Sequence, residues 1–258
     1  MSDLVVVITG ASAGIGAALA ERLAKGGARL ALAARREAEL RAVAARCGGE
    51  VLTLVTDVTR RGEVERLLDA TLNRFGHVDV WVNNAGRGIT RPVSQLTDDD
   101  LDEMMRVNVK SALYGMQTVL PHLKQRGRGH IINVSSMLSR IPFAPARAAY
   151  SASKHALNAL TANLRMELAR DFPGITVSTV MPGVVATEFG VNALHGGVDS
   201  RAFPTAQTAE QVAAVMAGLI AHPRADVYTR PEGQQRVVDY YAAPDMAAFE
   251  RQPEFRPS

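Results

Sequence analysis

Cysteine, tryptophan, lysine and long hydrophobic runs are scarce in this sequence. The chain of 258 residues has one cysteine, Cys47, which cannot form an internal disulfide and therefore favours a reducing compartment. We expect it to be a small, half-buried side chain. No segment reaches the roughly 18 consecutive apolar residues of a membrane-spanning helix, and the first residues lack the basic and apolar regions of a signal peptide. The sequence therefore predicts a cytoplasmic protein with no membrane partner.

Charge of one sign and clusters of metal ligands are also missing. The 29 basic and 26 acidic side chains leave a net charge of +3, and the arginines are scattered, so nucleic-acid binding stays only as a remote alternative. No two histidines stand at a ligand spacing on one helix, so we expect no metal site. The histidines are His77, His122, His130, His155, His195 and His222.

Apolar residues are plentiful and follow a regular order. They make up 47% of the chain, enough for a sizeable core, which excludes a fibrous or largely disordered protein. Short runs rich in β-branched residues alternate with segments of helical period. The predicted strands are residues 4–8, 30–34, 51–55, 78–82, 131–134, 175–180 and 226–229. The predicted helices are residues 15–25, 36–46, 63–75, 97–116, 150–170 and 208–221.

This alternation of strands and helices predicts the fold class. Parallel strands joined by helices need crossover connections, so we expect an α/β fold with a seven-stranded, mostly parallel, doubly wound sheet and helices on both faces. Capping-box patterns at Thr97 and Thr208 mark the starts of two of the helices.

Three glycines stand where the first predicted strand meets the first helix. Gly10, Gly14 and Gly16 allow a tight turn there and let a pyrophosphate approach backbone N–H groups at the positive end of the helix. The alternative is an ordinary turn between strand and helix. Further along the chain, Tyr150 and Lys154 stand one helical turn apart and share a helix face. A nearby ammonium lowers the pKa of a phenol, about 10 when free, and so suits it to acid–base chemistry.

Four motifs in register make the chain resemble the classical short-chain dehydrogenase/reductase family. They are Thr9-Gly10-x-x-x-Gly14-x-Gly16, Asn83-Asn84-Ala85-Gly86 after the fourth strand, Tyr150-x-x-x-Lys154 on a helix, and Pro182-Gly183 after the sixth strand. The resemblance covers residues 4 to about 187. It implies one Rossmann-type domain in residues 1–230, with residues 231–258 as its C-terminal tail. It also implies an enzyme that transfers hydride between NADP(H) and a carbonyl or secondary alcohol.

The resemblance implies roles for the catalytic residues Asn108, Ser136, Tyr150 and Lys154. Tyr150 is the general acid or base, and Lys154 holds the cofactor ribose and tunes the phenol. Ser136 hydrogen-bonds the substrate oxygen, and Asn108 holds a water for proton relay. Because the serine is one residue further from the tyrosine than in most relatives, Ser135 and Ser139 stay as alternatives.

Cofactor choice depends on the end of the second strand. Ala34 stands where NAD-preferring relatives carry a carboxylate, and Arg35 can grip the 2'-phosphate of NADP, with Ser12 assisting. The alternative is a solvated arginine at the start of a helix. The expected cofactor-binding residues are Gly10, Ser12, Ala13, Gly14, Ile15, Gly16, Arg35, Asp57, Val58, Asn84, Ala85, Gly86, Tyr150, Lys154, Pro182, Gly183, Val185 and Thr187.

Residues 188–207 are too long for a plain connector and predict a lid over an apolar substrate pocket. For His195 the alternatives are a polar substrate contact and, favoured over it, a solvated loop histidine. The substrate is expected to be a small apolar carbonyl compound or alcohol. Its expected contacts are Met137, Leu138, Phe143, Phe189 and His195.

Small residues recur along one side of the helix that carries Tyr150, and family members pair their subunits through this helix. The chain is therefore expected to form a homodimer or homotetramer. The residues are Ala152, Ala156, Ala159 and Asn163. Two other functions stay open: a non-catalytic NADP-binding sensor, and an epimerase or dehydratase of the extended branch, which needs a longer C-terminal substrate domain.

Overall fold

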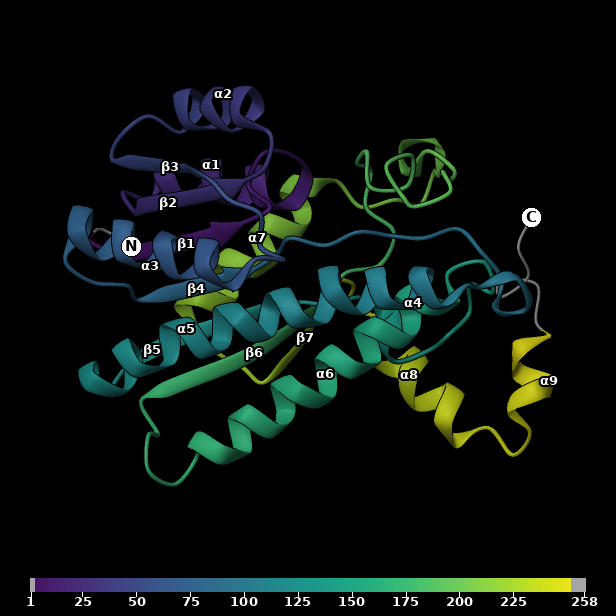
Figure 1. Cartoon of the computed structure of the whole chain (residues 1–258). Helices are drawn as coiled ribbons and strands as arrows, with labels where there is room; N and C mark the ends of the chain where they lie inside the picture. The colour runs from purple at the N-terminus through teal and green to yellow at the C-terminus, as the bar shows by residue number, and fades with distance from the viewer. Residues whose placement is uncertain (1–2, 252–258) are drawn as a thin grey trace.

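The computed structural model of the chain describes residues 3–251, and a parallel sheet of seven strands lies at its centre (Figure 1). Its strand order is β3-β2-β1-β4-β5-β6-β7, and every pair of neighbours is parallel. The strands are β1 (Val5–Thr9), β2 (Arg29–Ala34), β3 (Val51–Val55), β4 (Val80–Asn83), β5 (Gly129–Val134), β6 (Ile175–Met181) and β7 (Asp226–Tyr228). The predicted doubly wound fold is confirmed.

Helices cover both faces of this sheet, because successive strand residues point to opposite sides. Val6 and Ile8 of β1 pack with α1, α2 and α7, whereas Val5 and Val7 pack with α3, α5 and α6. Figure 1 shows the two layers. The helices are α1 (Gly14–Lys25), α2 (Glu37–Cys47), α3 (Arg61–Phe75), α4 (Asp98–Met105), α5 (Ser111–Arg126), α6 (Ala148–Leu168), α7 (Ala209–Ala221), α8 (Gly233–Ala242) and α9 (Met246–Glu250).

The chain direction changes beside β1. From β1 the chain builds outward through β2 to β3, then returns to add β4 on the other side of β1. The carboxyl ends of β1 and β4 therefore flank the switch point at which doubly wound folds bind ligands. The motif residues Gly10 and Asn84 both lie there.

The helix predicted over residues 97–116 is interrupted. It runs as α4, one π-helical turn over Arg106–Lys110, and then α5. The extra residue in a π turn shifts the faces of a helix, and such turns are frequent at functional sites. Here the turn contains Asn108, which is only 1% exposed. Both predicted capping boxes are present, at Thr97 and at Thr208.

The residues after Tyr228 form α8 and α9, for which the sequence carried no clear pattern. Tyr240 of α8 is buried against Met137, Ile141 and Met181, and its ring makes an edge contact with Phe249 of α9. The C-terminal segment therefore packs on the end of β6 and the turn after β5.

Three expectations from the composition can be compared with the structure of residues 3–251. Cys47 is half-buried as predicted, and burial raises the pKa of its thiol to about 11. No helix in this range is long and apolar enough to cross a membrane. The same residues contain no cluster of three or more His, Cys, Asp or Glu side chains that could hold a metal ion.

Candidate active site

The glycine loop after β1 has the backbone shape that a phosphate site needs. Gly10 and Gly14 have φ values of +66° and +54°, in the left-handed region that favours glycine. A Cβ on Gly10 would lie 2.8 Å from Cα of Ala85, and one on Gly16 would lie 2.5 Å from the Gly10 oxygen. The N-terminus of α1 has no side-chain cap. Close backbone packing and uncapped N–H groups fit the pyrophosphate of a dinucleotide.

Thr9 and Asn84 join this loop to the end of β4. The Thr9 hydroxyl donates to the Val82 oxygen at 3.2 Å and accepts from the backbone N–H groups of Asn84 and Ala85 at 3.0 and 3.2 Å. The Asn84 amide donates to the oxygens of Thr9 and Gly10. These bonds hold residues 84–86 beside the glycine loop, and Thr9 is a structural member of the site that sequence reasoning had not included.

The end of β2 presents a cation. Ala34 is buried, and Arg35 is exposed with no carboxylate within 4.0 Å among residues 3–251. Burial alone would raise the pKa of Asp57, but hydrogen bonds from Thr59 and the charge of Arg35 outweigh it and lower that pKa. Arg36 contacts the Ser12 hydroxyl at 3.4 Å. Arg35 and Asp57 therefore lie near each other at one end of the site, and the neighbouring Val58 packs against the core.

Residues after β6 close the other side of the loop. The methyl group of Thr187 lies 3.1 Å from the position of a Cβ on Gly14, so the two residues are in contact. Val185 pairs as a short bridge with Gln207, and the Pro182 oxygen accepts from the backbone N–H of Met137 at 2.8 Å. Gly183 lies beside the side chain of Arg230. Of the residues expected to hold the nicotinamide, Thr187 therefore reaches the glycine loop directly.

Tyr150 and Lys154 lie on the buried face of α6, with 8% and 4% exposure. The Lys154 ammonium donates to the Val134 oxygen at 2.8 Å and lies 5.8 Å from the centre of the Tyr150 ring. Burial lowers the pKa of Lys154 to about 8 and raises that of Tyr150 to about 12. The groups that oppose the rise are Ser136, through a hydrogen bond, and Arg147, through its charge. The sequence argument had assigned this effect to Lys154.

The three candidate serines have different partners. Ser136 lowers the pKa of the Tyr150 phenol against the effect of burial, and its hydroxyl accepts from the backbone N–H of Leu138 at 3.1 Å. Ser135 donates to the Lys154 carbonyl oxygen at 3.4 Å. Ser139 donates to the Ser136 carbonyl oxygen and accepts from the Asn158 amide. Ser136 is therefore the serine that faces the phenol.

Asn108 uses its whole amide group within the chain. Its oxygen accepts from the Arg87 N–H at 2.9 Å, and its nitrogen donates to the Arg87 oxygen and the Ser153 hydroxyl. A Cβ on Gly86 would lie 3.0 Å from the Asn108 oxygen and 3.6 Å from the Lys154 nitrogen. Asn108 and Lys154 thus flank Gly86, and Ser153 is a partner that sequence reasoning missed.

The predicted substrate residues fall into two groups. Leu138 packs against a cluster that includes Tyr150, and the Phe189 ring makes an edge contact with the Tyr150 ring at 5.6 Å between centroids. Met137 and Phe143 instead belong to the cluster around Tyr240, beneath α8. The structure therefore brings Leu138 and Phe189 to the phenol and does not bring Met137 and Phe143 there.

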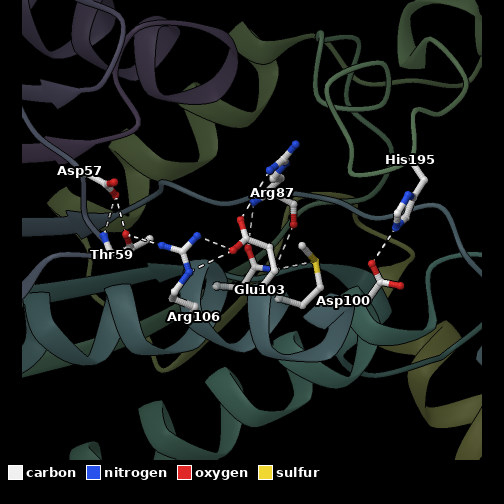
Figure 2. A network of polar contacts seen from close by, with 9 residues as sticks. Asp57, Thr59, Arg87, Asp100, Glu103, Arg106 and His195 are labelled. Atoms are coloured by element: carbon white, nitrogen blue, oxygen red, sulfur yellow. Dashed lines mark hydrogen bonds and ion pairs between the residues drawn. The ribbon is translucent and has the colours of Figure 1, made fainter. Parts of the chain in front are cut away.

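His195 is exposed to solvent, and its ring also has a hydrogen-bond partner. Its Nε2 lies 2.6 Å from a carboxylate oxygen of Asp100 (Figure 2). Arg91 donates to the other oxygen at 2.8 Å. His195 is thus a solvent-exposed loop histidine, as predicted, and its ring also ties the segment 188–207 to the start of α4. The capping box had marked Asp100, but nothing in the local sequence showed its contact with a residue 95 positions away.

A second part of this polar network joins the π turn to the cofactor side. Arg106 donates to the Thr59 hydroxyl at 2.7 Å and pairs with Glu103, and Thr59 in turn bonds Asp57 (Figure 2). Arg87 also reaches Glu103, at 3.5 Å. These contacts position the backbone around Asn108 relative to Asp57.

The comparisons with known proteins agree with this geometry. Residues 4–196 match the short chain dehydrogenase family. An uncharacterized oxidoreductase of Staphylococcus saprophyticus is 39% identical over 189 residues, which is 73% of this chain and 76% of the relative. The chain therefore belongs to the short-chain dehydrogenase family, and it is an oxidoreductase with a Rossmann-type fold.

Two solved structures show the likeness of the whole fold. A short-chain dehydrogenase/reductase from Burkholderia phymatum, in complex with NAD, has a TM-score of 0.86 at 28% identity and covers 100% of this chain and 98% of its own. An alcohol dehydrogenase from Thermococcus sibiricus, complexed with 5-hydroxy-NADP, has a TM-score of 0.77 at 30% identity. The match covers 87% of this chain and 95% of the alcohol dehydrogenase. Family members of similar structure thus bind nicotinamide cofactors.

Proposed function

We propose that the protein is an NADP-dependent dehydrogenase/reductase that interconverts a carbonyl compound and its secondary alcohol. The observation that carries the proposal is the buried Tyr150 side chain, with Lys154 beside its ring and Ser136 acting on the pKa of its phenol, at the carboxyl edge of the sheet. A paired hydroxyl and phenol can bind one carbonyl oxygen and exchange a proton with it. The scarcity of cysteine supports a cytoplasmic location.

The residues present fit a nicotinamide dinucleotide. The glycine loop and the uncapped N-terminus of α1 would hold the pyrophosphate. Asp57 and Val58 would contact the adenine. Residues 84–86 and Lys154 would hold the ribose, and Thr187 would hold the carboxamide. When bound, the cofactor supplies or accepts the hydride. Buried Ala34 and Arg35, which has no carboxylate within 4.0 Å among residues 3–251, support a preference for NADP, because they offer a 2'-phosphate a cation and no repelling carboxylate at this position.

In the reducing direction, the chain's own groups act on the carbonyl oxygen. As the carbon gains hydride, the electron pair of the carbonyl π bond moves to the oxygen, which takes the phenol proton of Tyr150. Ser136 donates a hydrogen bond to the same oxygen, and the Lys154 ammonium stabilises the resulting phenolate. One proton from solvent restores Tyr150, and we assign Asn108 to position the route for it beside Gly86. The alcohol and the oxidised cofactor are the products.

A rate and a binding measurement test this function. Wild-type protein is screened for NADPH oxidation against ketones and aldehydes, and Tyr150→Phe is compared with it. The variant loses the transferable proton and little else, so we expect turnover to fall by several orders of magnitude while NADPH titration by fluorescence is unchanged. Tyr114→Phe, on α5 beside Arg61, is the control and should keep full activity. Retention of more than about a tenth of the turnover by Tyr150→Phe would overturn the assignment. NADPH binding without turnover of any carbonyl would favour the sensor function.

A further inference from the structure

An arginine lies next to Tyr150 and has no acidic partner. Arg147 precedes α6 as its N-cap, and its side chain forms no hydrogen bond with the helix. One hydrogen bond leaves its guanidinium, from Nη1 to the Ile89 oxygen at 3.3 Å. No carboxylate lies within 4.0 Å of it among residues 3–251. A guanidinium has five N–H donors in a planar fork, so most of its donors have no protein acceptor here.

The acidic groups of the surrounding segments are paired with other cations. Asp100 is bonded to Arg91 and His195. Glu103 pairs with Arg87 and Arg106, and Glu188 with Arg36. Each of these carboxylates therefore already has at least one cation, and Arg147 is left without one.

Two glycines allow the Arg147 guanidinium to lie close to the backbone. A Cβ on Gly88 would lie 2.8 Å from Nη1 of Arg147 and 3.0 Å from the edge of the Phe189 ring. A Cβ on Gly197, in the segment 188–207, would lie 3.0 Å from Nη2. Larger residues at either position would meet the guanidinium. Since Phe189 also contacts the Tyr150 ring, this aromatic side chain lies near both the cation and the phenol.

A second polar group faces the same place. The Thr90 hydroxyl is buried and has no hydrogen-bond partner in the part of the chain that the structure describes. It lies 2.9 Å from the same Cβ position on Gly197 that is 3.0 Å from Arg147 Nη2. A buried hydroxyl without a partner costs roughly 1 to 3 kcal/mol, so a hydroxyl left unbonded beside a cation fits a place where a ligand supplies the acceptor.

The charge of Arg147 acts on the Tyr150 phenol. Burial lowers the pKa of its guanidinium, but arginine stays protonated at neutral pH. Its charge lowers the pKa of the Tyr150 phenol against the effect of burial. A half-buried cation without a counter-ion is unfavourable, and a bound anion would offset that cost.

We propose that Arg147, assisted by the Thr90 hydroxyl, binds a carboxylate of the substrate, so that the substrate class is an oxo acid and its hydroxy acid. The proposal rests on the proposed function, because it places the substrate carbonyl at Tyr150 and Ser136. The guanidinium fork matches a carboxylate in two parallel hydrogen bonds. Phe189 and Leu138 cover the apolar carbons between the two ends. The expected substrate then has an apolar part, as the sequence predicts, and in addition a charged carboxylate at one end.

A matched series of substrates tests the charge directly. The kcat/KM with NADPH is measured for 3-oxobutanoate, 4-oxopentanoate and 5-oxohexanoate and for their methyl esters, which keep the carbonyl and lose the anion. We expect at least one acid to exceed its ester by about tenfold or more, as a charge-assisted hydrogen bond allows. In Arg147→Met the ratio of the kcat/KM of the acid to that of its ester should fall to about one. It should fall partly in Thr90→Val and in Arg147→Lys, which keeps the charge without the fork. Arg128→Met, an exposed arginine before β5, is the control and should keep the wild-type ratio.

Binding separates a failure of this proposal from a failure of the proposed function. Calorimetric titration with 4-oxopentanoate, in the presence of NADP⁺, should give a Kd about tenfold weaker for Arg147→Met than for wild type. Turnover of esters and neutral ketones without preference for any acid would overturn the Arg147 proposal and leave the function intact. Arg147-dependent binding without turnover of any carbonyl would leave the anion site and overturn the function. If Arg147→Met does not fold, the ratios of Arg147→Lys and Thr90→Val decide.

Discussion

At the residue scale, Lys154 carries a charge that is buried within the site. Its ammonium is buried with one hydrogen bond, to the Val134 oxygen, and its pKa is lowered to about 8. In the unfolded chain a lysine has a pKa of about 10.4. Between these values the unfolded state binds more protons than the folded state, so the free energy of unfolding rises with pH. Below pH 8 the buried charge costs about 3 kcal/mol of stability, at 1.36 kcal/mol per pKa unit.

This cost predicts the stability of Lys154→Met. Urea unfolding between pH 7.5 and 10 should show the wild-type free energy of unfolding rising by about 2 to 3 kcal/mol more than that of the variant. The window ends at pH 10, because the raised pKa of Tyr150 acts in the opposite direction above it. The control is Lys124→Met on α5, where the wild-type ammonium lies over the ring of Phe172. This variant should follow the wild type. Equal slopes for wild type and Lys154→Met would show that this lysine does not carry the lowered pKa.

Arg35 gives a prediction at the other end of the site. If its guanidinium binds the 2'-phosphate, Arg35→Ala should weaken NADPH binding by about 1.5 to 3 kcal/mol, a factor of roughly 10 to 150, and leave NADH binding nearly unchanged. Fluorescence titration with both cofactors measures this. Arg41→Ala, which removes an exposed arginine paired with Glu37, is the matched control. Equal losses for both cofactors would assign Arg35 to the fold or the adenine pocket and withdraw the NADP preference.

At the element scale, local patterns predicted most of the fold. The strands and caps follow from runs and spacings within a few residues, as at Val5–Thr9 and Thr97. Tyr150 and Lys154 could be paired from the sequence because four residues make one helical turn. The π turn at Asn108, the helix α8 and the position of Arg147 could not, because they depend on packing between segments far apart in the chain.

The segment 188–207 shows how such packing works. Leu194 exchanges backbone hydrogen bonds with the stretch after β4, donating to Gly88 and accepting from Thr90. His195 has a φ of +63°, a strained conformation for a residue with a side chain, and its ring bonds Asp100. The His195 hydrogen bond is the largest influence on the pKa of Asp100, and with bonds from Thr97 and Arg91 it holds that pKa well below its usual range against burial. The segment is therefore fixed to α4 by an ionised carboxylate.

Replacing that carboxylate should release the segment. Asp100→Asn should have a lower Tm than wild type at pH 6 and faster tryptic cleavage after the exposed Arg201. A depressed pKa contributes stability above about pH 4, the unfolded value, and that contribution is lost as the pH falls through the folded value. The difference in Tm should therefore narrow from pH 5 to pH 3. Asp99→Asn, in the same helical turn but exposed, is the control. Cleavage at the wild-type rate in Asp100→Asn would show that the backbone bonds alone hold the segment.

At the scale of the whole molecule, the two ends of the site are joined by one continuous set of contacts. Arg106, Thr59 and Asp57 connect α4 and the π turn to the cofactor side, while Asp100 connects α4 to the segment 188–207 (Figure 2). Arg35 and Arg147, which have no carboxylate within 4.0 Å among residues 3–251, lie near the two ends of this set. The arrangement suits a ligand pair with an anionic group at each end, a 2'-phosphate and a substrate carboxylate.

The outer side of α6 gives the last prediction, a homodimer or homotetramer. This long helix packs its other side on β6 (Figure 1), and Ala152, Ala159 and Asn163 of the small-residue stripe are exposed. Met166, on the same helix, is 66% exposed. An apolar, small-residue surface allows a second helix to approach closely, so we expect light scattering at micromolar concentration to give a multiple of the 27.6 kDa chain mass. Ala159→Arg should shift the protein toward the monomer by placing two charges at the contact, whereas Ala42→Arg on the exposed side of α2 should not. A monomeric wild type would refute the assembly, and an oligomer unaffected by Ala159→Arg would place the interface elsewhere.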